Sequence, residues 1–251
     1  MTTTVSGETP LFAQTGSSQF FIPRDVYLCR TDDGAIFMDL NSGKYFGLDL
    51  NQTDSLLPWI AGSPHRGDSF RHDADDGHAI ASDLSQRGLL TQSNELGRLL
   101  HIPQLKHTSA VPFRGTLVPR PAIATHHVIN FAYACMRTRF DLKLRPLACT
   151  VRRISARKAH ERQDLIQDTS QLLLLVRVFR YLTPLCYTAR GACLFDSLAL
   201  VEFLAKYNTY PTWVIAVRTR PFEAHSWVQH NELVLNERLE RVEEFVPIMT
   251  V

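Results

Sequence analysis

The chain has 251 residues, 45% of them hydrophobic and 21% charged, which is ordinary for a globular protein and excludes disordered, collagen-like and coiled-coil chains. Its 27 basic and 25 acidic residues leave a net charge of +2, too balanced for a protein that binds nucleic-acid phosphates. The charge is divided unevenly, because residues 1–80 hold 11 acidic and 5 basic residues, whereas residues 81–251 hold 14 and 22. This asymmetry suggests two units with different roles.

The sequence also indicates the compartment. It has no run of about 18 apolar residues, so we expect no membrane span. The N-terminus lacks the basic and apolar regions of a signal peptide, so we expect a cytoplasmic protein. The five cysteines are scattered and contain no CxxC pair. That pattern argues against a disulfide framework and a structural zinc site, and we assign no metal ligands.

The first unit is predicted over residues 22–92, after a flexible tail at 1–21. Short apolar runs predict strands, with Asp32-Asp33-Gly34 as a hairpin signal between the first two. Asn51 or Thr53 can cap a following helix that runs to about residue 60. The predicted elements are strands at 26–30, 35–40, 44–50 and 89–91 and helices at about 51–60 and 77–86. They form a small α+β unit with one exposed sheet edge.

Residues 93–124 are rich in proline and are predicted as a linker. The second unit, residues 125–251, places helices before a mostly antiparallel sheet, so the chain belongs to the α+β class. The first predicted helical segment begins near residue 125. A second helix is predicted over about 163–182, ended by Pro184, and a third over about 193–207. Its predicted strands are 212–218, 226–229, 233–235 and 244–249. The basic run 143–158 is either a solvated helix face or a dock for an acidic partner or for the acidic N-terminal unit.

Cys193 begins a predicted helix, and this position favours nucleophilic chemistry. The helix dipole and the unpaired N–H groups of the first turn stabilise a thiolate and lower the pKa of the thiol. The same N–H groups can form an oxyanion hole. A cysteine at a helix start is also commonly a small buried hydrophobe.

His225 and Glu237 lie six residues before and six residues after Asn231, the centre of a predicted turn. In an antiparallel pair those positions lie opposite each other, so the carboxylate is expected to reach the imidazole. Such a pair orients the ring and stabilises the imidazolium that a thiolate requires. Glu223 and Glu240 are weaker candidates for the acid.

Three further residues are candidates for a role in the site. Tyr187 stands six residues before Cys193, at an offset suited to an oxyanion donor. Asp196 either complements the helix dipole or binds substrate backbone. Trp227 either walls the site beside His225 or packs in the core.

Two long stretches carry a family resemblance. CLFDSLALVEFL (193–204) and PTWVIAVRTRPFEAHSWVQHNELVLNE (211–237) resemble the leader peptidases of lasso-peptide biosynthesis, the B proteins, whose catalytic domain is transglutaminase-like and related to papain. KYFGLDLNQTDSLLPWI (44–60) resembles the leader-recognition module fused in front of such peptidases, a winged-helix-like unit similar to a small peptide chaperone.

The resemblance implies the roles of the candidate residues. Cys193 would be the nucleophile and His225 the base, with Glu237 in place of the family's usual Asp. The edge strand would bind the leader of a ribosomally made precursor through Lys44, Tyr45, Phe46, Gly47 and Leu48. The enzyme would hydrolyse the leader–core peptide bond and free the core amine for a partner cyclase similar to asparagine synthetase. It would bind no cofactor, and any dependence on ATP would come through the cyclase.

Two other functions stay open. A transglutaminase-type acyl transferase uses the same thioester chemistry with an amine as acceptor, and a non-catalytic scaffold needs only the leader-binding unit. For the leader peptidase, we expect removal of residues 1–92 to damage cleavage of the precursor more than it damages the folding of 125–251.

Overall fold

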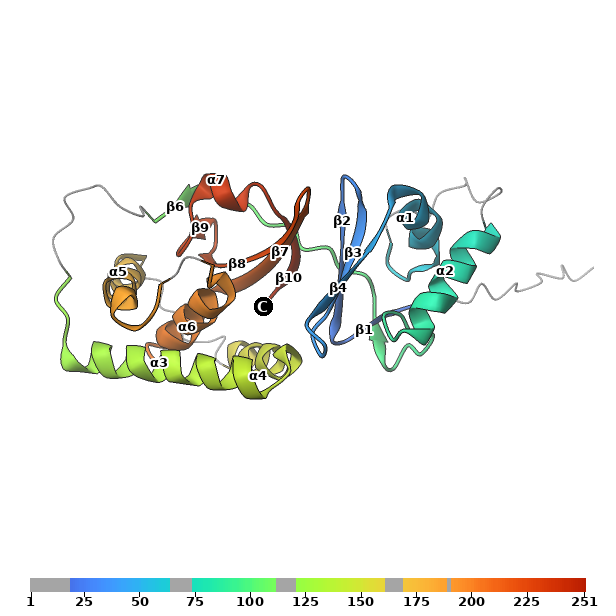
Figure 1. Cartoon of the computed structure of the whole chain (residues 1–251). Helices are drawn as coiled ribbons and strands as arrows, with labels where there is room; N and C mark the ends of the chain where they lie inside the picture. Colours follow the sequence, from blue (N-terminus) through green and yellow to red (C-terminus); the bar gives the residue numbers. More distant parts are fainter. Residues whose placement is uncertain (1–18, 64–73, 112–120, 161–168, 189–190) are drawn as a thin grey trace, which may run out of the picture.

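The computed structural model describes residues 19–63, 74–111, 121–160, 169–188 and 191–251 and has the α+β architecture that the sequence predicts (Figure 1). A three-stranded antiparallel sheet of order β2-β3-β4 carries its own helices, and a five-stranded sheet of order β10-β7-β8-β9-β6 packs against a second group of helices. No helix among the described residues is long and apolar enough to cross a membrane.

The N-terminal unit contains three of the predicted strands in an antiparallel meander, with Phe37 paired to Leu28 on one side and Phe46 on the other. Its elements are β1 (Ile22–Pro23), β2 (Val26–Thr31), β3 (Gly34–Asp39), β4 (Lys44–Leu48), α1 (Leu50–Leu56), the 3₁₀ helix η1 (Leu57–Trp59), α2 (Ala74–Gln86) and β5 (Gly97–Arg98). Gly34 follows the β2–β3 turn at φ 137°, and a Cβ there would lie 2.0 Å from the Leu48 carbonyl oxygen. Only glycine therefore fits this close approach.

The limits of the first helix differ from the prediction. Asp49 is the N-cap, in place of Asn51 or Thr53, because its carboxylate accepts the Gln52 N–H at 2.9 Å while the Gln52 side chain accepts the Asp49 N–H at 3.2 Å. The helix ends at Leu56, and Pro58 sits in the 3₁₀ turn that follows. The segment Leu89-Leu90-Thr91, predicted as a strand, forms only an isolated bridge, from Thr91 to Phe21.

The boundary segments contribute to the folded units. Phe20, predicted in the tail, is fully buried, and its N–H donates to the Trp59 carbonyl at 2.9 Å. In the predicted linker, β5 pairs with β1, and β6 (Ser109–Ala110) pairs in parallel with β9. Residues 1–18 and the linker prolines Pro112 and Pro119 lie outside the described residues.

The second unit places helices before strands, as predicted. Its elements are α3 (Thr125–Leu144), α4 (Leu147–His160), α5 (Thr169–Cys186), α6 (Cys193–Ala205), β7 (Thr212–Thr219), β8 (Phe222–His230), β9 (Leu233–Val234), α7 (Leu239–Val242) and β10 (Val246–Thr250). Pro184 does not stop α5, which continues to Cys186. The proline lies in the last turn, and Tyr187 N–H still bonds to the Thr183 carbonyl at 3.1 Å. Residues 163–168 of that predicted helix are outside the described ranges.

Part of the basic run 143–158 neutralises buried acids. Arg153 donates to Glu202 and to Asp141, both at 2.7 Å, and Arg157 donates to Glu202 at 3.0 Å. Both carboxylates are almost fully buried. Arg152 also lies 3.6 Å from Asp25 of the N-terminal unit, an exposed pair of small energetic weight. Arg153 and Arg157 of the run therefore serve the interior of the second unit.

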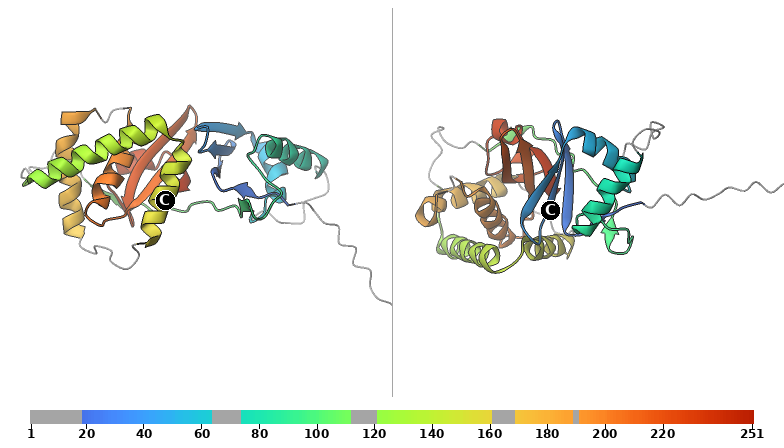
Figure 2. Two further views of the ribbon diagram at one scale, coloured as in Figure 1. Left: turned by 90° about the horizontal axis from the view of Figure 1, so that it is seen from below. Right: turned by 45° about the vertical axis from the view of Figure 1, so that its right-hand side comes forward.

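The two units share one core (Figures 1 and 2). β2 lies beside β10, and the face of the small sheet that points away from α1 and α2 packs against the second unit. Tyr45 stacks edge-on with Phe222 at 5.4 Å between ring centroids, and the Leu40 carbonyl accepts the Ala148 N–H at 3.3 Å. Four buried residues of the small sheet belong to the hydrophobic cluster that contains Phe203 and Trp213: Cys29, Ile36, Met38 and Leu40.

We predict that the two units unfold together, because removing the small sheet would expose the shared cluster to water. Calorimetry of the whole chain should show one transition whose calorimetric and van't Hoff enthalpies agree. A fragment of residues 101–251, which keeps β6, should melt at a markedly lower temperature. Two resolved transitions in the whole chain, or an unchanged midpoint in the fragment, would show independent units.

Candidate active site

Cys193 is the first residue of α6, and Ala192 is the N-cap. From Asp196 to Leu204 the helix is buried, so its N-terminus reaches the surface from inside the domain. Ser197 fastens the first turn to the sheet, because its hydroxyl donates to the Ser226 carbonyl at 2.9 Å. The thiol is half-buried and points into a cleft.

The structure brings His225 and Glu237 to this thiol. His225 lies on β8 and is 8% exposed, and its Nε2 is 2.8 Å from Glu237 Oε2. The second ring nitrogen remains for the hydrogen bond with Cys193. Glu223, the weaker candidate for the acid, instead pairs with Arg218 and Arg241.

The electrostatics of the three groups support one another. Burial alone would raise the pKa of Cys193, but the hydrogen bond from His225, its charge and backbone donors at Ser226 and Leu194 lower the pKa below its usual value. Burial alone would lower the pKa of His225, but Cys193 and Glu237 raise it to about 9. Burial opposes the ionised form of Glu237 as well, yet the His225 contact lowers its pKa. The directions of these three shifts all favour a thiolate–imidazolium pair with a carboxylate behind it.

Glu237 reaches His225 by a different route from the predicted strand pairing. β9 ends at Val234, so Glu237 follows the strand and does not face His225 across a ladder. The Asn236 side chain takes the place of the ladder, since its Oδ1 accepts the Val228 N–H at 2.7 Å. The chain is then free to bend, and the Glu237 carboxylate turns back toward the imidazole.

Asn236 also connects this bend to α6. Its Nδ2 donates to Asp196 Oδ2 at 2.8 Å, and the Tyr187 hydroxyl donates to Asp196 Oδ1 at 2.7 Å. Burial raises the pKa of Asp196, while these two donors and Arg180 act against that rise. Arg180 donates to the Leu235 and Val111 carbonyls. The Asp196 carboxylate and the Tyr187 hydroxyl are thus engaged with each other.

Trp227 is fully buried in a cluster with Val214 and Phe245, and its ring centroid lies 6.2 Å from that of His225. It packs in the core and at the same time backs the imidazole. The predicted leader-binding residues Lys44, Tyr45, Phe46, Gly47 and Leu48 form β4, the outer strand of the small sheet. Tyr45 faces the second unit, whereas Phe46 and Leu48 face the core of the first.

The thiol opens into a cleft of about 460 Å³ that both units line. The β3–β4 hairpin supplies Met38 and Tyr45 from one side, and the α3–α4 corner supplies Leu142 and Leu147 from another. Cys193 and His225 close the third side, together with other residues. The sequence pointed to the second strand of this hairpin for leader binding but not to the hairpin as a wall of the catalytic cleft, because residues so distant in the chain carry no pairing signal.

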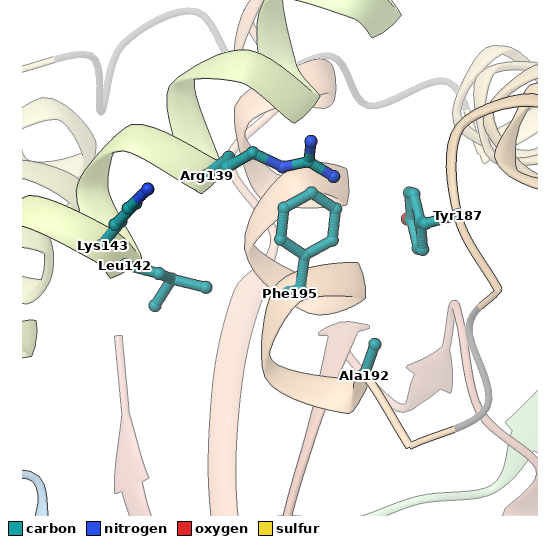
Figure 3. Close-up of a pocket in the computed structure, with 6 residues that line it drawn as sticks. All are labelled: Arg139, Leu142, Lys143, Tyr187, Ala192 and Phe195. Atoms are coloured by element: carbon teal, nitrogen blue, oxygen red, sulfur yellow. The ribbon is translucent and has the colours of Figure 1, made fainter.

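A second hollow of about 420 Å³ lies beside the start of α6 (Figure 3). Its lining includes Ala192 and Phe195, at the start of α6, and Tyr187. Helix α3 contributes Arg139 and Lys143 along its rim. It is apolar at its base and basic at its edge. Among the described residues, no cluster of three or more His, Cys, Asp or Glu is placed to hold a metal ion.

Residues 134–250 match the family described as the transglutaminase-like superfamily. No curated protein and no solved structure matches the chain. The match covers α6 and β8, which carry Cys193 and His225, and the bend that carries Glu237, so residues 134–250 form a transglutaminase-like domain.

We predict that Cys193 is the most readily alkylated thiol near neutral pH, because only the thiolate reacts and the pKa of Cys193 is lowered. Iodoacetamide labelling resolved by peptide mass spectrometry tests this, with exposed Cys149 as the internal control. His225→Ala should abolish the advantage of Cys193 over Cys149. Glu237→Gln should reduce it less, since it removes only the support that keeps the pKa of His225 near 9. Equal labelling of Cys193 in the wild type and in His225→Ala would refute the ion pair.

We predict that Asn236 acts on the thiol through Glu237. Asn236→Ala should reduce Cys193 labelling about as much as Glu237→Gln, and the double variant should be no worse than Glu237→Gln alone. Loss of the buried hydrogen bonds costs about 1–3 kcal/mol, so thermal midpoints are measured in parallel. Thr209→Ala removes another buried hydroxyl, bonded to the Tyr207 carbonyl at 3.2 Å, and should leave labelling unchanged. Additive losses would assign Asn236 a separate role.

Proposed function

With a transglutaminase-like domain at residues 134–250 as the premise, we propose that this protein is a cysteine peptidase that removes the leader from a lasso-peptide precursor. The observation that carries the proposal is the position of the Cys193–His225–Glu237 group in a cleft that is walled by the predicted leader-binding unit. The resemblance of residues 193–204 and 211–237 to lasso-peptide leader peptidases supplies the substrate.

The site can perform peptide hydrolysis in two steps. The Cys193 thiolate attacks the carbonyl carbon of the scissile bond, and the first-turn N–H groups of α6 stabilise the oxyanion. The His225 imidazolium gives its proton to the leaving amine of the core, which leaves the leader as a thioester on Cys193. Neutral His225 then takes a proton from water as the water attacks the thioester, and the leader departs as a carboxylic acid. Glu237 stabilises the imidazolium at both stages.

The direction of β4 suits this substrate. The strand begins at Lys44 and Tyr45, beside the cleft, and ends at Leu48, in the core of the first unit. A peptide strand added antiparallel to β4 would have its C-terminal end at the cleft. Because the scissile bond lies at the C-terminal end of a leader, antiparallel addition would deliver that bond to Cys193, and parallel addition would carry it away.

The freed core amine is the group that a partner cyclase similar to asparagine synthetase would join to a side-chain carboxylate. We place the protein in the cytoplasm with that cyclase and the precursor. This chain needs no cofactor of its own for the steps above.

We predict that Cys193→Ala abolishes leader removal but leaves leader binding within about twofold of wild type, because the thiol lies outside the strand edge that would hold the leader. Mass spectrometry of the precursor reports cleavage, and fluorescence anisotropy of a labelled leader peptide reports binding. Retained cleavage in Cys193→Ala would overturn the catalytic role. Wild-type binding without cleavage, with the cyclase and ATP supplied, would favour the scaffold.

The same assay separates hydrolysis from acyl transfer. With a small primary amine present, a peptidase yields the leader with a free carboxylate, whereas a transglutaminase-type enzyme yields an amide at that position or at a glutamine side chain. The two products differ in mass.

A further inference from the structure

Helix α3 carries its large apolar side chains on the outside. Four residues of its inner face are fully buried, two apolar and two polar: Phe131, Ala134, Thr138 and Asp141. Cys135 and Leu142 are partly buried and pack against the same core. Its exposed large apolar side chains are Val128, Ile129, Tyr133, Met136, Phe140 and Leu144. Ile129 and Met136 are 62% and 66% exposed, and they belong to a group of apolar side chains on one helix rather than to isolated surface positions. A helix whose outer face is more apolar than its inner face normally has a binding partner on that outer face.

Five of these residues form a narrow stripe, which we define as Ile129, Tyr133, Met136, Phe140 and Leu144. The steps along the chain are four, three, four and four residues. Steps of three and four are the a and d positions of a coiled-coil seam. At about 100° per residue the stripe occupies roughly 80° of the helix surface, and it extends for nearly the whole helix. Its shape fits a second helix.

One border of the stripe is basic. Arg139 and Lys143 lie along one side, where they also form the rim of the hollow beside Cys193 (Figure 3). The acid on α3, Asp141, is buried and bound by Arg137 and Arg153. The exposed part of α3 therefore offers two cations along one flank of an apolar seam, and a helix with acidic residues beside its own apolar seam would complement it.

We propose that the α3 stripe is a docking site for an acidic amphipathic helix of a protein partner. A second copy of this chain fits less well, because two such stripes would bring Arg139 and Lys143 against the same cations. Anionic lipid also attracts cations, but a membrane-surface helix presents a broad apolar face, whereas this seam is narrow and has the spacing of helix–helix packing. The site is separate from the β4 edge, so the full chain can hold a leader and a partner helix together.

A partner helix on this stripe would lie next to the catalytic region. A helix seated on the stripe would place its acids against Arg139 and Lys143, at the edge of the hollow that Ala192 and Phe195 line next to Cys193. The docking site thus adjoins the start of α6 without using the catalytic residues.

The probe is a fluorescein-labelled helix of repeated heptads with Leu at positions a and d and Glu at positions e and g. Binding to the full-length protein is followed by fluorescence anisotropy at two salt concentrations. A peptide of the same composition in scrambled order and a peptide with Lys in place of Glu are the controls. We expect saturable binding of the Glu helix alone, weaker at higher salt.

Met136→Glu/Phe140→Glu should weaken binding about tenfold or more, as loss of central anchors does. Leu96→Glu/Leu99→Glu, a matched change at exposed leucines of the N-terminal unit, should leave binding unchanged. Arg139→Glu/Lys143→Glu should reverse the preference in favour of the Lys helix, and this variant keeps the test decisive if the Met136/Phe140 variant fails to fold. Circular dichroism checks folding in each case.

Three results would overturn the proposal. The first is no binding, or equal binding of the scrambled helix. The second is sedimentation of the wild type as a dimer that Met136→Glu/Phe140→Glu makes monomeric, which would assign the stripe to a second copy. The third is binding of phosphatidylserine vesicles by the wild type that the same variant abolishes, without binding of the Glu helix, which would assign it to a membrane surface.

Discussion

The site depends on a positive charge at His225, a residue that is more than nine-tenths buried. Burial disfavours a charged imidazole, so the imidazolium exists only because negative groups lie on both sides of the ring, the Cys193 thiolate and the Glu237 carboxylate. Loss of either the thiolate or the carboxylate would lower the pKa of His225 and so weaken the remaining ion pair. The surrounding hydrogen bonds can be understood as devices that hold these groups together: Ser197 to Ser226, and Asn236 to Asp196 and Val228.

The shared core fixes the proposed leader-binding strand relative to the thiol. β3 is buried on both faces, with Phe37 in the core of the first unit and Met38 in the core of the second. The hairpin that follows is therefore fixed relative to Cys193, and Tyr45 forms part of both the β4 edge and the cleft wall. A leader bound along β4 would enter the cleft in a fixed direction, because β4 is held rigidly relative to Cys193. A flexible tether would raise only the local concentration of the substrate, whereas this arrangement also sets its direction.

Local signals in the sequence predicted most of the elements, because hairpin glycines, apolar periods and helix starts act within a few residues. The contact of Glu237 with His225 was also predicted, but from a strand pairing that does not exist. β9 stops at Val234 because the Asn236 side chain replaces the backbone as acceptor, and nothing in the sequence distinguishes such an asparagine from an exposed one. The cleft wall could not be predicted at all, since it requires the packing of β3 against a unit that begins more than eighty residues later.

Helix α6 shows how the fold fixes the thiol. The dipole at its N-terminus favours a thiolate, but the dipole alone contributes about 0.3–1 kcal/mol at an exposed position and cannot set a direction. The orientation of α6, and with it the direction in which the thiol points, is fixed by contacts at both ends of the helix. Glu202 at the distal end is held by Arg153 and Arg157, and Ser197 and Asp196 at the near end are tied to β8 and to Asn236. Because Arg153 also binds Asp141 on α3, the interior of α3 must be polar at that point. The demand for ion pairs inside the domain thus helps to leave the apolar residues of α3 on its outer face, where a partner can reach them.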